Sequence, residues 1–193
     1  MAYFPKERLA EHKHPLCHTT VEYFGPMEVE LSRNRTDKRY GASLTCQTTG
    51  AVYLDLALSL SSDDFLNLLP RFVVTYSTPE KINSTPTKLV SLSEKELLVQ
   101  LKNMPESGEL KNWPHKKGIV WKFQPPSATY FGGAHDCLVR SMKLALYRAL
   151  NIEKKRLRLP TEEMLRTLLF EVAGLLNSRA LTYTSSDPED LRP

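Results

Sequence analysis

The sequence has no long hydrophobic run and few cysteines. No apolar stretch approaches the roughly 20 residues that a membrane-spanning helix requires, so we expect no membrane segment. Residues 1–8 carry charges where a secretory signal peptide needs an apolar segment. Three cysteines in 193 residues are too few and too scattered for a disulfide framework. These absences predict an intracellular protein, in the nucleus or the cytoplasm, with reduced thiols.

Motifs of several common enzyme classes are also missing. The sequence contains no glycine-rich phosphate loop and no nucleophile elbow, and we expect no small-molecule substrate. Cys46 and Cys137 are expected to be small core side chains rather than nucleophiles. Three histidines and Cys17 lie within residues 12–18, but their spacing fits no standard zinc template. That misfit favours chance clustering over a zinc site.

Basic charge is concentrated in one segment of a chain whose net charge is only +4. Residues 137–160 carry a net charge of +6, which leaves about −2 for the rest of the chain. The basic side chains of this segment are Arg140, Lys143, Arg148, Lys154, Lys155, Arg156 and Arg158. A local basic stripe suits a polyanion such as DNA better than a uniformly basic surface does. The alternative is a solvated helix end.

The first third of the chain predicts an antiparallel meander. Apolar and polar residues alternate in part, and the pair Gly25-Pro26 predicts a bend or bulge in the first strand. A charged turn is expected at residues 33–38, and short turns between strands favour antiparallel pairing. The three expected strands span residues 19–31, 40–48 and 51–58.

The remaining chain alternates helical patterns with short strands. Ser61 supplies N-cap chemistry, and Pro70 is expected to kink the following helix or shift its start. The expected helices begin near Ser61, Ser93, Ala134 and Thr161, and the expected strands lie within residues 81–90 and 118–124. This order predicts one α/β domain at residues 19–184, a mixed sheet flanked by helices, with a lead-in at 1–18 and a loose tail at 185–193.

Six runs of residues resemble the integrase core of BEL/Pao retrotransposons. They are VEYFGP at 21–26, KRYG with LTCQTT at 38–49, AVYLDLA at 51–57, FGGA with LVRSMK at 131–143, LNSRALT at 176–182 and SSDPED at 185–190. The resemblance covers about residues 5–193 and implies a ribonuclease-H-like fold, a five-stranded mixed sheet whose first three strands are antiparallel. It also implies DNA as the partner, a possible homodimer formed through the long helices, and a core without its flanking segments.

The resemblance also implies a metal site. In that family, three carboxylates bind two Mg²⁺ or Mn²⁺ ions that promote in-line displacement at phosphorus. The three positions correspond to Glu22, Thr85 and Asp136 in this sequence. The first acid is one methylene too long, the second is a neutral hydroxyl, and the third is one methylene too short. Because a working site tolerates displacements of only about 0.5 Å, we expect a pseudoenzyme in which Glu22 and Asp136 bind metal weakly if at all.

Several functions remain open at this point. The chain is expected to be a degraded integrase core from a transposable element that still binds DNA. It could instead be a host-retained dimerisation or protein-interaction module without DNA binding, an active integrase or nuclease with a variant triad, or a decayed reading frame. Asp55 and Glu80 could replace the missing acid, but we expect both to be surface or strand-end carboxylates.

Overall fold

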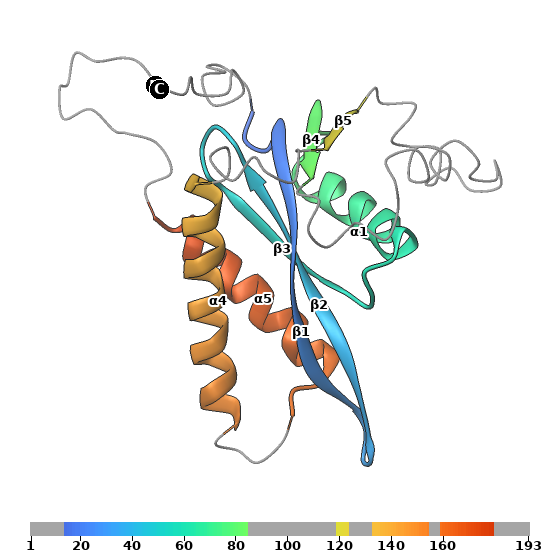
Figure 1. Ribbon diagram of the computed structural model, residues 1–193. Coiled ribbons are helices and arrows are strands. Elements are labelled where there is room, and N and C mark those ends of the chain that lie inside the picture. The colour runs from blue at the N-terminus through green and yellow to red at the C-terminus, as the bar shows by residue number, and fades with distance from the viewer. Residues whose placement is uncertain (1–13, 85–118, 124–132, 155–158, 180–193) are drawn as a thin grey trace.

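The computed structural model describes residues 14–84, 119–123, 133–154 and 159–179 (Figure 1). The strands in these residues are β1 (His18–Ser32), β2 (Arg35–Cys46), β3 (Val52–Ala57), β4 (Lys81–Ser84) and β5 (Val120–Phe123). The helices are α1 (Ser62–Thr75), α4 (Gly133–Lys154) and α5 (Glu162–Asn177). The helix expected after Ser93 lies outside the described residues.

All five strands belong to one mixed sheet with the order β3-β2-β1-β4-β5. Strands β1, β2 and β3 pair antiparallel, whereas β4 pairs parallel with both β1 and β5. Helices α4 and α5 lie on one side of the sheet and α1 on the other (Figure 1). This arrangement is ribonuclease-H-like, so the predicted fold class and the antiparallel first three strands are confirmed.

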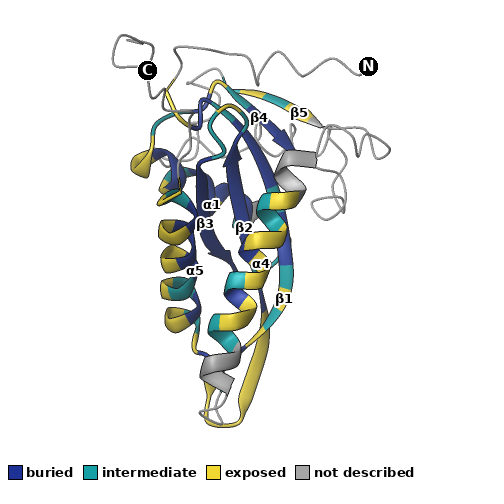
Figure 2. Ribbon diagram, turned by 90° about the vertical axis from the view of Figure 1, so that its left-hand side faces the viewer, coloured by how far each residue is buried: buried dark blue, intermediate teal, exposed yellow. Residues whose placement is uncertain are grey.

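Strand alternation divides the buried side chains between two cores, because successive residues of a strand point to opposite faces of the sheet. Val21 packs with Phe65 and Phe72 on the α1 side. Phe24 packs with Met142 of α4 and Leu169 of α5 on the other side. Each fully buried large apolar side chain stabilises the fold by about 1.5–3 kcal/mol. Figure 2 shows α4 and α5, with exposed outer surfaces, on one side of the buried strands, and the exposed far end of the β1–β2 hairpin.

The expected bend in β1 is confirmed. The register with β2 shifts between Phe24 and Met27, so the intervening Gly25-Pro26 forms an irregularity in the ladder. Gly25 has φ +120°, which L side chains rarely adopt, so glycine fits this position and other residues would be strained. The bend separates the buried first half of β1 from a largely exposed second half.

The turn between β1 and β2 is shorter than predicted. The charged segment 33–38 was expected to be a turn, but β2 already begins at Arg35, which leaves only Arg33 and Asn34 between the strands. Opposite charges face each other across the ladder, as in the pair of Glu28 with Lys38, and such pairs stabilise exposed strands. The prediction from the charge pattern alone therefore placed the start of β2 too late in the sequence.

Helix α1 begins where its N-cap predicts. Ser61 has an extended backbone, and its side chain accepts a hydrogen bond from the Asp64 amide. Pro70 lies inside the helix, which starts at Ser62, so the alternative that Pro70 shifts the helix start is wrong. Tertiary packing of Phe65 and Phe72, both fully buried, holds the helix on the sheet.

The start of α5 is fixed by a cap and by an ion pair. The Thr161 side chain accepts a hydrogen bond from the Met164 amide. Glu162 accepts a hydrogen bond of 2.6 Å from Nε of Arg39, a buried residue on β2. An acid at this position also interacts favourably with the helix dipole. These contacts attach the first turn of α5 to the sheet.

The end of α5 covers the edge of the sheet. Asn177 Oδ1 accepts from the Val52 amide at 2.8 Å, and its Nδ2 donates to the Val52 carbonyl at 2.7 Å. Arg179 donates to the Gly50 carbonyl at 2.7 Å. The two side chains form hydrogen bonds with backbone groups at the start of β3. Because β3 is an edge strand, strand pairing would leave these backbone groups without partners. Residues of the run at 176–182 therefore have a structural role.

A pair of glycines tests the packing between β1 and β2. A Cβ at Gly41 would overlap the ring of Phe24, whereas a Cβ at Gly174 meets nothing within 4 Å. We expect Gly41→Ala to destabilise the protein by about 1–3 kcal/mol through overpacking. Gly174→Ala should stabilise it by about 0.5–1 kcal/mol because helix interiors disfavour glycine. Urea denaturation measures both changes, and equal effects would contradict the packing described here.

Candidate functional site

Glu22, the first expected metal position, lies in the middle of the sheet. It is half-buried on β1, opposite Ser43 of β2. Alternation along the strand puts it on the same face as Phe24, which packs against the side of the sheet covered by α4 and α5. The first position therefore faces the helix that carries the third.

The second position follows β4 directly. Parallel pairing places Val21 opposite Ser84, the last residue of β4. Ser84 is fully buried, and its hydroxyl accepts a hydrogen bond of 3.2 Å from Nε1 of Trp121. Thr85 comes next in the chain and lies outside the described residues. The sheet thus brings the end of β4 beside Glu22.

The third position belongs to α4. The backbone of Asp136 lies near the start of this helix, which begins at Gly133, and its side chain is outside the described part of the structure. Helix α4 packs on the face of the sheet to which Glu22 points. Glu22 thus lies on β1 and the backbone of Asp136 on α4, whereas Thr85 is outside the described residues.

The donor set of these positions does not fit two magnesium ions. Mg²⁺ requires near-octahedral oxygen coordination, and two such ions need several anionic oxygens to offset their charge. Here the end of β4 offers the neutral Ser84, whose hydroxyl already accepts from Trp121, followed by the neutral Thr85. Only Glu22 and Asp136 carry charge, and both differ in length from the acids that the resemblance implies.

The basic face predicted on α4 is exposed where it is described. Arg140, Lys143 and Arg148 are exposed, while Met142 and Leu146 of the same helix are buried. Helix α4 is therefore amphipathic over this stretch. Lys154 ends α4 with its side chain outside the described part, and Lys155, Arg156 and Arg158 lie outside the described residues.

The comparisons with known proteins give a likeness of structure but none of sequence. No family model matches the sequence. No curated protein matches it either. A chain in the cryoEM structure of a simian T-cell lymphotropic virus intasome, in complex with PP2A regulatory subunit B56 gamma, superposes on 97% of this chain with a TM-score of 0.56 and 12% identity. The chain has an integrase-like fold.

The likeness extends over nearly all of this chain but over only part of the intasome chain. This chain covers 64% of the length of the intasome chain. At 12% identity the likeness shows the fold and not the residues of a site.

Among the described residues, none of the helices combines the length and apolar character needed to cross a membrane.

Asp55 is not the surface carboxylate that we expected. It is 1% exposed in the middle of β3, and its Oδ2 accepts from Nε of Arg71 at 2.6 Å and from the hydroxyl of Tyr53 at 3.2 Å. Its Oδ1 accepts from the Leu56 amide at 2.7 Å and lies 4.0 Å from Nε of Arg166. Burial and, to a smaller extent, the charge of Asp55 raise the pKa of Tyr53. The Tyr53 hydroxyl therefore stays protonated and donates its hydrogen bond. Asp55 therefore joins α1 and α5 to β3 in this integrase-like fold.

Glu80 agrees with the expectation of a strand-end carboxylate. It is exposed and directly precedes β4, at the opposite end of that strand from Ser84. It lies beside Cys17 and His18, two residues of the cluster that sequence spacing assigned to chance. No sequence pattern connects Glu80 with this cluster, because pairing of β1 with β4 is needed to bring them together.

The two cysteines expected in the core have different environments. Cys46 is buried, and its Sγ accepts from the Leu16 amide at 3.2 Å and the Thr49 amide at 3.4 Å. Burial acts to raise the pKa of Cys46, but the hydrogen bonds outweigh it and the pKa is lowered. Cys137 is exposed on α4, so the prediction of a core side chain is wrong there. It lies on the solvent side of an amphipathic helix whose buried stripe runs through other residues.

A hollow that sequence reasoning missed lies between the bend of β1 and α4. Its volume is about 570 Å³, and its lining includes Pro26, Tyr147 and Leu150 together with the cations Lys38 and Lys143. The Gly-Pro break was the available signal, but only the packing of α4 against the bend creates the space. Glu28 also lines the hollow, which therefore carries both signs of charge between α4 and the β1–β2 hairpin.

The structural role of Asp55 can be tested directly. We expect Asp55→Asn to destabilise the protein by about 1–3 kcal/mol, because a buried charge-assisted hydrogen bond to Arg71 is lost. The control Glu171→Gln changes an exposed acid on α5 and should stay within about 0.5 kcal/mol of the wild type. Urea denaturation compares the two, and similar stabilities would mean that Asp55 has no structural role.

Proposed function

We propose that this chain is a BEL/Pao-type integrase core that binds DNA through α4 and has a degraded strand-transfer site. One observation carries the proposal: α4 has exposed basic residues, Arg140, Lys143 and Arg148, on an integrase-like fold. The departures of Glu22, Thr85 and Asp136 from the acids that the resemblance implies support a degraded site. The six runs that resemble the BEL/Pao family support the finer assignment.

The basic face suits the DNA backbone. Arg140, Lys143 and Arg148 are all exposed on α4, whereas Met142 and Leu146 of the same helix are buried. Cations on a helix face contact phosphates and give affinity without reading sequence. We therefore expect non-specific, salt-dependent binding to duplex DNA.

A matched pair of double variants tests this surface. We expect Arg140→Ala with Lys143→Ala to weaken duplex binding at low salt on the order of 10-fold, and to reduce the slope of log affinity against log salt by about 1.8, or 0.9 for each lost phosphate contact. The control, Arg33→Ala with Arg35→Ala, removes the same charge from the exposed hairpin. Fluorescence anisotropy across a salt series measures both variants.

The comparison of the two double variants decides whether DNA binds the α4 surface or responds only to the net charge of the protein. A larger loss for the α4 variant supports the proposed surface. Equal losses would mean that DNA responds only to net charge, and an absence of wild-type binding at low salt would exclude DNA binding.

The degraded site predicts a gain of function on repair. We expect the wild type to bind no pair of Mg²⁺ ions and to transfer no strands. The triple variant Glu22→Asp, Thr85→Asp and Asp136→Glu should gain Mg²⁺ affinity because it restores three carboxylates of matched length. Calorimetric titration with Mg²⁺ measures the change, with Asp136→Ala in the wild-type background as the control.

The opposite outcome would favour the variant-triad alternative. If the wild type binds two Mg²⁺ ions, and metal-dependent DNA cleavage disappears in Glu22→Ala, the chain is an active enzyme and its site is not degraded.

A second candidate function is protein interaction. Phe170 of α5 is 49% exposed and Tyr76, after α1, is 41% exposed, and both rings lie near that of Tyr53 at 6.5 and 5.8 Å between centroids. This apolar surface beside the edge strand supports a dimer or another protein partner. A dimer in light scattering combined with no retention of duplex DNA would favour this function over the first.

A further inference from the structure

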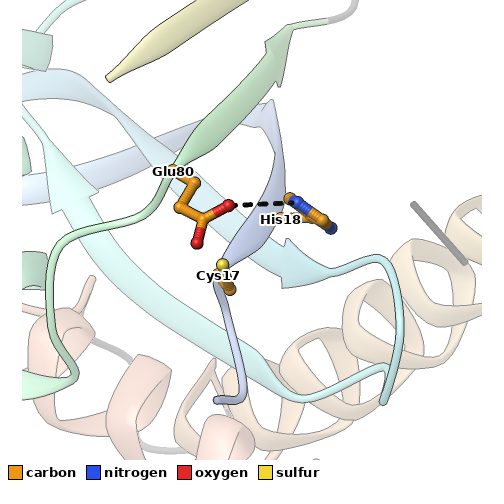
Figure 3. Close-up of side chains that lie close together, drawn as sticks. All are labelled: Cys17, His18 and Glu80. Carbon is orange, nitrogen blue, oxygen red and sulfur yellow. Dashed lines mark ion pairs between the residues drawn. The ribbon is translucent and has the colours of Figure 1, made fainter. Parts of the chain in front are cut away.

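Three side chains of metal-binding types meet where β1 and β4 begin. The Sγ of Cys17, a ring nitrogen of His18 and a carboxylate oxygen of Glu80 all lie within 4.8 Å of one another (Figure 3). Nε2 of His18 is 3.8 Å from Oε2 of Glu80. A thiol, an imidazole and a carboxylate are the three protein ligand types that zinc accepts.

The backbone, rather than attraction among the side chains, holds this cluster together. The amides of Glu80 and Lys81 both donate to the Cys17 carbonyl, at 2.9 and 3.2 Å. His18 pairs with Lys81 in the parallel ladder of β1 and β4. Before the strand, Leu16 has φ 66° and its amide donates to Sγ of Cys46. The turn and the ladder therefore position the ligands in advance.

The dimensions of the cluster fit one tetrahedral ion. Zinc bonds of about 2.3 Å to sulfur and 2.0–2.2 Å to nitrogen and oxygen place a nitrogen–oxygen pair about 3.3–3.6 Å apart and a sulfur–nitrogen or sulfur–oxygen pair about 3.5–3.7 Å apart. The His18–Glu80 pair at 3.8 Å needs to close by about half an ångström at most, and the remaining pairs, all within 4.8 Å, by about 1.3 Å at most. A thiolate with an imidazole selects zinc over magnesium, which prefers oxygen ligands alone.

Burial leaves one side of the cluster open. Cys17 is 2% exposed, the His18 side chain is 13% exposed and that of Glu80 is 56% exposed. The enclosed thiol side reduces competition from water, while the side of Glu80 is open to solvent. A site with three protein ligands and an open position holds a water molecule as its fourth ligand.

The cluster is separate from the degraded acid positions. Glu22 lies four residues farther along β1 than His18, or about 13 Å at the rise of an extended strand. Ser84 ends β4, whereas Glu80 precedes its first residue. We propose that Cys17, His18 and Glu80 form a zinc site, with water as the fourth ligand, that ties the turn before β1 to the start of β4.

Cobalt substitution tests the site on the full chain, reduced and free of affinity tags. We expect one Co²⁺ per chain, with the visible bands of a tetrahedral complex and a near-ultraviolet thiolate-to-cobalt band that Zn²⁺ removes by displacement. Cys17→Ser should lose the thiolate band. Glu80→Gln should weaken Zn²⁺ binding on the order of 10-fold or more, since even outer partners of metal sites have effects of that size.

Matched controls separate this site from adventitious binding. Cys137→Ser removes an exposed thiol on α4, and Glu171→Gln an exposed acid on α5, so both should bind metal as the wild type does. Glu80 is exposed, so Glu80→Gln keeps the test valid even if Cys17→Ser fails to fold. Zn²⁺ should raise Tm in the wild type and in Glu171→Gln more than in Glu80→Gln.

Three results would overturn the proposal. They are the absence of a thiolate band in the wild type, its persistence in folded Cys17→Ser, and equal Zn²⁺ affinities for Glu80→Gln and Glu171→Gln. None of these depends on whether the chain binds DNA, so the zinc site and the proposed function fail or stand separately.

Discussion

The parallel pairing of β1 with β4 is the constraint on which the rest of this structure depends. It places Val21 opposite Ser84, which brings the end of β4 to Glu22. The same ladder sets His18 opposite Lys81 and so brings Glu80 to Cys17. One run of backbone hydrogen bonds therefore brings together two groups of side chains at opposite ends of a short strand. Neither group would form if β4 joined the sheet elsewhere.

The two ends of that ladder have different chemistry. Beside Glu22, the described end of β4 presents a buried hydroxyl that already accepts a hydrogen bond from an indole, which is a poor environment for hard dications. Beside Glu80, a thiol and an imidazole approach a carboxylate, which suits a softer ion. The two apolar cores hold the sheet and helices of this integrase-like fold together, so the fold does not depend on acids at the expected positions.

Asp55 shows why an acid near the sheet is not automatically a metal ligand. Its carboxylate is buried and accepts hydrogen bonds from an arginine, a tyrosine and a backbone amide. Removing a buried carboxylate from such partners to coordinate a metal would leave those donors unsatisfied. The charge of Asp55 is thereby committed to joining α1 and α5 to the edge strand, in the same region where Asn177 covers the backbone of β3.

The residues alone predicted the order of the described strands and helices, the bend at Gly25-Pro26 and the N-cap at Ser61, because each follows from periodicity or from neighbouring residues. The resemblance to BEL/Pao integrases supplied the three candidate metal positions. Among these, the structure describes the side-chain surroundings of Glu22 only. Only the tertiary structure decided that Asp55 is buried, that Cys137 is exposed and that Glu80 meets Cys17 and His18. These depend on which distant segments pair, and local patterns carry no information about partners across a sheet.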